Sequence, residues 1–196
     1  MVKIAVLISG SGSNLQSLID NVRNGYINGE IKLVVSSSPS AYGLQRANDS
    51  GIKGLCIKDQ NELLKTLKDE NIDLIVLAGY LAIVSSEIIH EYHNRIINIH
   101  PSLIPSFCGK GFYGLHVHKA AMKRGVKVSG ATVHFVSEEV DGGPIILQES
   151  IDVSDCDTPE MMQKKVLTIE HKILPKAVKL YCDNKLEVID ERVKIK

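Results

Sequence analysis

Two polar residues, Asn98 and His100, stand two positions apart at the end of a short apolar run and are followed by Pro101. Successive strand residues point to opposite faces of a sheet, so these two side chains would share one face, and Pro101 would keep His100 extended. An amide donor suits a developing oxyanion, and an imidazole exchanges a proton near neutral pH. The pair therefore fits catalysis, although the same spacing also fits two hydrogen-bonded residues at a strand end.

Asp141 belongs to a second polar segment, residues 140–144, with the sequence Val-Asp-Gly-Gly-Pro. Two glycines followed by a proline fix a special backbone path, which would aim the acid. A carboxylate beside His100 would raise the pKa of the imidazole and orient its ring. Spacing alone does not bring Asp141 to His100, and such loops often use an aspartate to form an Asx turn.

A glycine-rich loop, residues 9–14 with the sequence Ser-Gly-Ser-Gly-Ser-Asn, lies between an apolar run and a helical pattern. Glycines let backbone N–H groups turn toward a ligand, and a helix N-terminus adds positive potential, so the loop fits a phosphate. A dinucleotide fingerprint needs a third glycine where Leu15 stands, and an acid after the second strand, where residues 35–38 are Val-Ser-Ser-Ser. The pattern indicates a phosphate site of mononucleotide size or, alternatively, a tight turn capped by Ser13 or Asn14.

Glu170 interrupts an apolar stripe at helical spacing that includes Val166, Leu174 and Val178. An unpaired charge in such a stripe would be strongly destabilising. We therefore expect Glu170 to have a partner, either a hydroxyl or amine of a ligand or a cation in a structural ion pair.

The elements that position these residues alternate along the first hundred positions. Apolar runs at 2–8, 31–35, 74–78 and 96–100 predict strands, and the patterns at 14–22, 42–49, 62–70 and 86–92 predict helices, with Asp59 capping the third. Strands that are apolar throughout and alternate with helices imply a parallel sheet covered on both faces.

After Pro101 the pattern changes to an irregular, glycine-rich loop and a helix at about 117–123. The runs 128–136 and 145–153 are joined by too short a connection for a crossover helix, so they predict an antiparallel pair. A helix should follow from about Asp157 or Thr158, with Pro159 in its first turn and a kink or break at Pro175. The fold class expected is a single Rossmann-like α/β domain over residues 1–196, with a mostly parallel sheet and an antiparallel strand pair in its C-terminal half.

Composition excludes several classes of protein. Lys+Arg and Asp+Glu both number 23, and this balance argues against nucleic acid as a partner. The four cysteines are scattered, so we expect reduced thiols, and His116-x-His118 lacks the spacing of a helical metal pair, so no metal is expected. No run has the ~20 apolar residues of a membrane span, and the first residues do not form a signal peptide, which makes the cytoplasm the expected location.

Six segments resemble one family. The segments ISGSGSN (8–14), LAGYL (77–81), NIHPSLIPSF (98–107), ATVHFV (131–136), VDGGPIILQ (140–148) and IEH (169–171) are similar to those of the folate-dependent formyltransferases. The first of these segments narrows the resemblance to the glycinamide ribonucleotide formyltransferases. The similarity runs in register from Ile4 to about Leu186.

The resemblance assigns a role to individual residues. It implies that Asn98, His100 and Asp141 are catalytic, that Gly12, Ser13 and Asn14 hold the substrate phosphate, and that Glu170 contacts the ribonucleotide. It places the folate pocket against Leu81, Ala82, Ile83, Val84, Asn98, Ser137, Glu138, Glu139, Val140 and Asp141, with Asn61 nearest the folate tail. Relatives often carry Arg where Ala82 stands and near Asn61, and Gln where Leu167 stands.

The implied reaction transfers the formyl group of 10-formyltetrahydrofolate to the amine of glycinamide ribonucleotide, by direct attack in a monomer or homodimer. Asn98 and a protonated His100 would stabilise the oxyanion, and Asp141 would keep His100 charged. The alternatives are a formyltetrahydrofolate hydrolase or a methionyl-tRNA formyltransferase, which usually carry a further domain that this length would not hold. A non-catalytic module that binds a phosphorylated ligand would explain the glycine loop but not the three polar residues.

Overall fold

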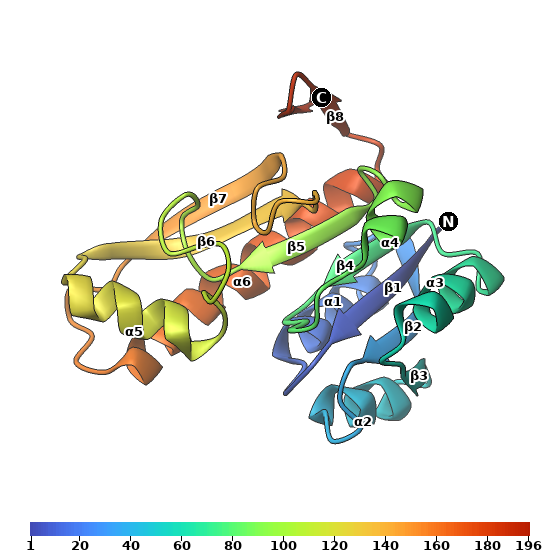
Figure 1. The fold of residues 1–196 in the computed structure, drawn as a ribbon, viewed down its shortest axis with the longest axis horizontal. Helices are drawn as coiled ribbons and strands as arrows, with labels where there is room; N and C mark the ends of the chain where they lie inside the picture. The colour runs from blue at the N-terminus through green and yellow to red at the C-terminus, as the bar shows by residue number, and fades with distance from the viewer.

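The computed structural model describes residues 1–196 and has a seven-stranded sheet as its centre (Figure 1). The strands are β1 Val2–Ile8, β2 Gly29–Ser36, β3 Lys53–Cys56, β4 Leu74–Leu77, β5 Ile96–His100, β6 Val128–Phe135 and β7 Ile145–Asp152, and β8 Leu186–Ile189 and β9 Arg192–Ile195 form a separate hairpin. The helices are α1 Ser13–Arg23, α2 Tyr42–Asp49, α3 Gln60–Asp69, α4 Ser86–Glu91, α5 Leu115–Arg124 and α6 Pro159–Cys182.

The strand order is β3-β2-β1-β4-β5-β6-β7. The first five strands in this order are parallel, whereas β6 pairs antiparallel with both β5 and β7. The expected fold class is confirmed, including the antiparallel pair in the C-terminal half. The predicted cap of α3 is also present, because the Asp59 side chain accepts from the Glu62 N–H at 2.8 Å.

Helices cover both faces of the sheet. On one face α1 and α6 pack against alternate strand residues such as Ile4, Val6 and Ile97. On the other face α3 and α4 pack against the intervening residues, such as Ala5 and Leu7. In Figure 1, α6 passes behind β5 and β6, while α3 and α4 lie in front of the sheet. The front of β5 and β6 has no helix and instead carries the irregular segments 101–114 and 136–144 (Figure 1).

We expected Pro175 to kink or break α6, but the helix runs unbroken from Pro159 to Cys182. A proline cannot donate to the carbonyl four residues earlier, which belongs to His171. That carbonyl accepts from the Ser17 hydroxyl of α1 at 2.9 Å. Contact with α1 therefore satisfies the group that the proline leaves free, and the helix continues.

The sequence did not predict β3 or the hairpin β8–β9. β3 is a short edge strand that contains Gly54 and is largely exposed, so it shows neither an apolar run nor alternation. The hairpin turns at Asp190 and Glu191, both with positive φ, where Asn-Gly or Asp-Gly would have signalled such a turn. No helix of the chain is both long and apolar enough to cross a bilayer.

Candidate active site

Asn98 and His100 lie on the front face of the sheet, where helices are absent. Their neighbours Ile97 and Ile99 point to the opposite face and join the core beneath α6. Across the antiparallel ladder Asn98 pairs with His134, and His100 pairs with Thr132. Cross-strand pairs have side chains in contact, so the carboxyl end of β5 and the middle of β6 form one polar surface.

The His100 ring is buried and held by the loop that follows β5. Its Nε2 donates to the carbonyl oxygen of Phe107 at 2.9 Å, so the proton of the neutral ring resides on Nε2. Phe107 has φ 50°, a left-handed backbone that is uncommon for a bulky residue. The remaining ring nitrogen, Nδ1, lies 3.5 Å from Asp141 Oδ2, beyond normal hydrogen-bond distance, and faces the site.

Asp141 reaches His100 because the β6–β7 connection folds back over the sheet. Its backbone is left-handed, with φ 58°, and its Oδ2 accepts from the Gly109 N–H at 2.8 Å. Gly143 has no room for a side chain, since a Cβ there would lie 2.0 Å from the Phe135 carbonyl oxygen. The expected proximity of Asp141 and His100 is therefore confirmed, while the catalytic roles of the three residues stay predictions.

The Asp141 carboxylate acts to raise the pKa of His100 as expected, but the net direction of the shift is downward. Burial lowers the pKa of His100 and outweighs the opposing influence of the Asp141 carboxylate and the Phe107 carbonyl. Burial acts to raise the pKa of Asp141, but contacts with His134, His100 and the Gly109 N–H hold that pKa below its usual range. The site therefore favours a neutral imidazole beside an ionised carboxylate near neutral pH.

His134 fixes the amide of Asn98. The His134 Nδ1 lies 2.7 Å from the carbonyl oxygen of Phe135 and must donate to it, which leaves Nε2 as the acceptor in the neutral ring. The Asn98 Nδ2 lies 3.0 Å from that Nε2 and donates to it. Thr132 and His134 are two positions apart on β6 and so share a strand face, but this spacing gives no signal for the contact with Asn98.

The glycine loop forms the tight turn between β1 and α1. Gly12 has φ 69° and supplies the N-cap residue of α1 without a side-chain cap. A Cβ on Gly12 would lie 2.7 Å from the Cα of Gly43, so the loop rests directly on α2. The N-cap residue of α1 is therefore Gly12 rather than Ser13 or Asn14, and the first N–H groups of α1 are available to an anion, while the phosphate role of the loop stays a prediction.

Glu170 lies against the start of α1, where its Oε2 accepts from the Asn14 side-chain amide at 2.7 Å. Within the chain its partner is therefore a neutral amide and not the cation of an ion pair, while its contact with a ligand stays a prediction. Burial raises the pKa of Glu170, and the Asn14 contact opposes this only in part. Asn14 Oδ1 is buried without a hydrogen-bond partner, so this pair retains polar capacity beside the glycine loop.

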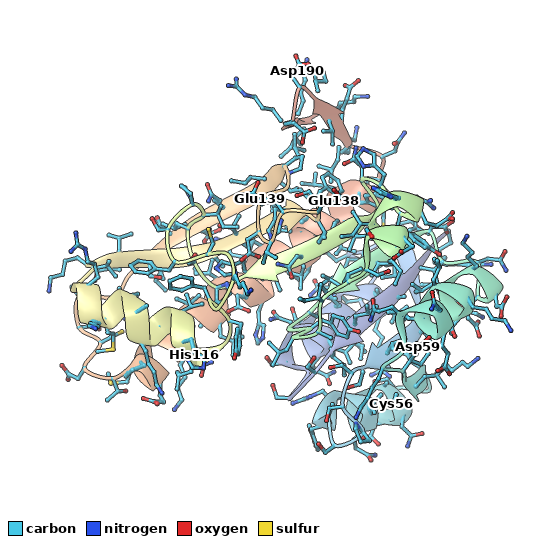
Figure 2. All side chains as sticks on the ribbon, viewed as in Figure 1. Cys56, Asp59, His116, Glu138, Glu139 and Asp190 are labelled. Carbon is cyan, nitrogen blue, oxygen red and sulfur yellow. The ribbon has the colours of Figure 1, made fainter.

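The residues assigned to the folate pocket fall in two irregular segments. In the first, Leu81 and Ile83 are exposed and Val84 is buried; in the second, the exposed Glu138, Glu139 and Val140 lead to Asp141. Figure 2 shows Glu138 and Glu139 on the β6–β7 connection. The first segment follows β4 and the second follows β6, and these strands are the two neighbours of β5 in the sheet.

Two contacts join the first folate segment to its neighbours. The Leu81 N–H donates to Ser9 Oγ at 2.8 Å, which links this segment to the first residue of the glycine loop. The Ser85 N–H donates to Gln60 Oε1 at 3.1 Å, which links it to the start of α3. Asn61 follows Gln60 and is exposed in the first turn of α3, the helix that begins after Asp59, which Figure 2 labels.

Comparison with known proteins places this fold and site in a family. The formyl transferase family profile matches residues 2–178. The chain is 37% identical to the chloroplastic phosphoribosylglycinamide formyltransferase of Arabidopsis thaliana, over 94% of this chain and 67% of that protein. It is 36% identical to the phosphoribosylglycinamide formyltransferase of Escherichia coli, over 95% of this chain and 90% of that one.

Solved structures agree with these sequence relationships. Glycinamide ribonucleotide transformylase 1 of Symbiobacterium toebii superposes with a TM-score of 0.94 at 41% identity, over all of this chain and 94% of that chain. A formyltetrahydrofolate deformylase of Pseudomonas syringae superposes at 0.90 with 27% identity, and this chain covers 65% of it. The chain spans 14% of the trifunctional purine biosynthetic protein of Drosophila melanogaster, to which it is 41% identical.

The chain therefore belongs to the formyl transferase family. Within that family it groups with the phosphoribosylglycinamide formyltransferases.

Proposed function

We propose that the protein transfers the formyl group of 10-formyltetrahydrofolate to the amine of glycinamide ribonucleotide in purine biosynthesis. The observation that carries this proposal is the convergence of Asn98, His100 and Asp141 on one face of the sheet, with His100 Nδ1 facing the site and 3.5 Å from Asp141 Oδ2. The names of two relatives support glycinamide ribonucleotide as the acceptor, and the name of the deformylase neighbour supports a formyltetrahydrofolate as the donor.

The reaction joins the two substrates directly. The neutral substrate amine attacks the formyl carbon, forming a C–N bond and a tetrahedral intermediate with an oxyanion. The bond from that carbon to the folate nitrogen then breaks, and a proton passes from the former amine to the leaving nitrogen. Proximity replaces covalent catalysis, so no serine or cysteine nucleophile is needed.

His100 serves this reaction as a proton acceptor. Its Nε2–H is committed to Phe107, so the Nδ1 lone pair of the neutral ring is the atom that can take the amine proton. The imidazolium formed lies beside the Asp141 carboxylate, which stabilises it before the proton moves on. Asn98, oriented by His134, supplies an N–H donor to the oxyanion. The neutral resting state replaces the protonated His100 expected from the sequence.

The remaining site residues bind rather than react. The phosphate of the ribonucleotide occupies the turn at Gly12, Ser13 and Asn14, and Glu170 receives a ribonucleotide hydroxyl while it is held by Asn14. The folate ring lies between the segment 81–84 and the segment 137–141, with its tail toward Asn61. The protein requires no metal and no nucleic acid or membrane partner in this scheme.

A spectrophotometric assay tests the proposal. Formylfolate is supplied with and without glycinamide ribonucleotide, and the absorbance change on forming tetrahydrofolate is followed. We expect turnover only when the ribonucleotide is present, together with one formylated ribonucleotide per folate released. Equal turnover without the ribonucleotide would instead establish the hydrolase activity that the deformylase neighbour represents.

A further inference from the structure

The side chain of Arg46, on α2, contacts both the glycine loop and the first turn of α1. Its Nε donates to the Ser11 carbonyl oxygen at 2.9 Å, and its Nη1 donates to Gln16 Oε1 at 3.2 Å. Its guanidinium lies 5.1 Å above the Tyr42 ring, and its Cδ would lie 3.4 Å from a Cβ on Gly12. No site role was assigned to Arg46 from the sequence, which gives no signal that a residue 35 positions away meets the loop.

These contacts control which way the loop's backbone groups face. The Gly10 carbonyl accepts from the Gly43 N–H at 3.1 Å, the Ser11 carbonyl accepts from Arg46, and the Gly12 carbonyl accepts from the Gln16 N–H at 2.9 Å. Three successive carbonyl oxygens are therefore held by α1 and α2. With the carbonyls fixed in this way, the N–H groups of the loop are the ones presented to a ligand, and an anion meets donors rather than acceptors.

Arg46 also brings a full positive charge to a loop that otherwise offers only partial charges. A phosphate ester carries close to two negative charges at neutral pH. The planar guanidinium keeps its charge at every physiological pH, and stacking on Tyr42 with two hydrogen bonds leaves it little freedom. Asp20, the nearest acid in this network, bonds to Gln16 Nε2 and not to Arg46, so it does not pair the guanidinium.

We propose that Arg46 is a positioning residue for the phosphate of the ribonucleotide substrate, acting by orienting the turn Ser11–Gly12 and by its charge. The inference rests on the proposed function, because it takes the glycine loop as the phosphate site. Its effect belongs to binding of the phosphorylated substrate. The chemistry at His100, on β5, is separate from it.

The test compares Arg46→Gln and Arg46→Lys with Arg23→Gln. Arg23 is a matched control because it also links α1 to the end of α2, through the Ser50 carbonyl at 3.4 Å, but from the C-terminal end of α1, away from the glycine loop. We expect Arg46→Gln to raise the KM for the ribonucleotide about ten- to a hundredfold, with kcat and the folate KM nearly unchanged. Arg46→Lys keeps the charge but loses the planar guanidinium, so its KM for the ribonucleotide should lie between those of the wild type and Arg46→Gln. Arg23→Gln should match the wild type.

A second measurement does not depend on catalysis. The backbone amide signals of Gly12, Ser13 and Asn14 are followed by NMR while ribose 5-phosphate is added to the wild type and to each variant. We expect Arg46→Gln to weaken this binding by the same factor as the KM, and high salt to reduce the difference between the proteins. Equal ribose 5-phosphate binding in wild type and Arg46→Gln, or a fall in kcat with an unchanged KM, overturns the role of Arg46. A wild type that binds ribose 5-phosphate at these amides yet formylates no ribonucleotide overturns the proposed function instead.

Discussion

Two opposing influences act on the imidazole of His100, and their balance sets its state. Burial disfavours the charged ring, while the Asp141 carboxylate at 3.5 Å favours it, and burial is the larger. If His100 is neutral at the start and becomes charged only during the reaction, the Asp141 carboxylate stabilises the transition state more than the starting state. Only an interaction that is stronger in the transition state accelerates the step. The acid limb of kcat/KM should therefore lie below the ordinary histidine pKa of 6.5.

Changing Asp141 to Asn tests this balance. The substitution removes the influence that raises the pKa of His100, so that pKa should fall further and the acid limb should move to lower pH. Turnover should fall by roughly a hundredfold or more, because the imidazolium formed in the transition state loses its partner. NMR titration of the His100 ring and pH–rate profiles measure both effects, with the exposed Asp49→Asn as a control. An unchanged His100 pKa would mean that Asp141 only shapes its loop.

For single residues, the sequence indicated the side chains of the candidate active site but not the backbone groups that hold them. Asn98, His100 and Asp141 could be found because amide, imidazole and carboxylate groups are specific to a few residue types. The Phe107 carbonyl and the Gly109 N–H belong to groups that nearly every residue has, so only the folded loop identifies them. The pKa of His100 could not be predicted either, since it depends on burial by segments distant in sequence.

The turn between β1 and α1 depends on the packing of α2 as much as on its own sequence. Gly12 lies against Gly43, and Gly43 in turn leaves no room for a side chain, because a Cβ there would lie 2.3 Å from the Ile8 side chain. A pair of glycines therefore lets a helix approach the end of a buried strand.

Gly12→Ala should disturb the turn between β1 and α1 through backbone strain and through a clash with Gly43. Gly25→Ala introduces the strain without the clash and so separates the two effects. Both glycines have φ near 70–80°, so both alanines are strained by about 1–2 kcal/mol, but a Cβ on Gly25 meets no atom within 4 Å, whereas one on Gly12 meets Gly43 at 2.7 Å. We expect both variants to unfold at lower urea concentration, Gly12→Ala more so, and only Gly12→Ala to raise the ribonucleotide KM. A rise in the folate KM instead would mean that the two pockets are assigned in reverse.

Buried strands were predictable from sequence, and exposed ones were not. β1 and β4 are apolar because both of their faces pack against helices, so their runs stand out. β3 and the hairpin β8–β9 are held mainly by backbone pairing, which leaves little pattern in their side chains. Pro175 shows the reverse case, where a strong local signal for a break is overridden by the Ser17 hydroxyl.

For the whole molecule, buried histidines make folding dependent on pH. Burial lowers the pKa of His100 and His171, and lowers the pKa of His118 to about 4. A lowered folded pKa means that the unfolded chain binds more protons below about pH 6.5, so stability is lost as pH falls from there toward the folded pKa. Glu170 has the opposite sign, because its raised pKa favours folding at acid pH and costs stability as pH rises.

His118→Gln should make the free energy of unfolding less dependent on pH between about 6.5 and 4. The His118 Nδ1 is buried without a partner, so the substitution removes a proton site and no hydrogen bond at that atom. Urea unfolding at pH 8, 6.5, 5.5 and 4.5 measures the slope, with the exposed His93→Gln as control. Equal slopes in His118→Gln and the wild type would show that His118 does not contribute to acid unfolding.

The strand order also sets the distance between the glycine loop and His100. The glycine loop, where we propose that the phosphate binds, follows β1, His100 ends β5, and β4 is the one strand between them. Neighbouring strands are about 4.8 Å apart, so the loop and His100 are separated by roughly 10 Å across the sheet. Under the proposed function, an amino-phosphate much shorter than this cannot reach His100 while its phosphate stays in the loop. The spacing of the backbone would then select substrates by molecular span, independently of their charge and of every side chain in the site.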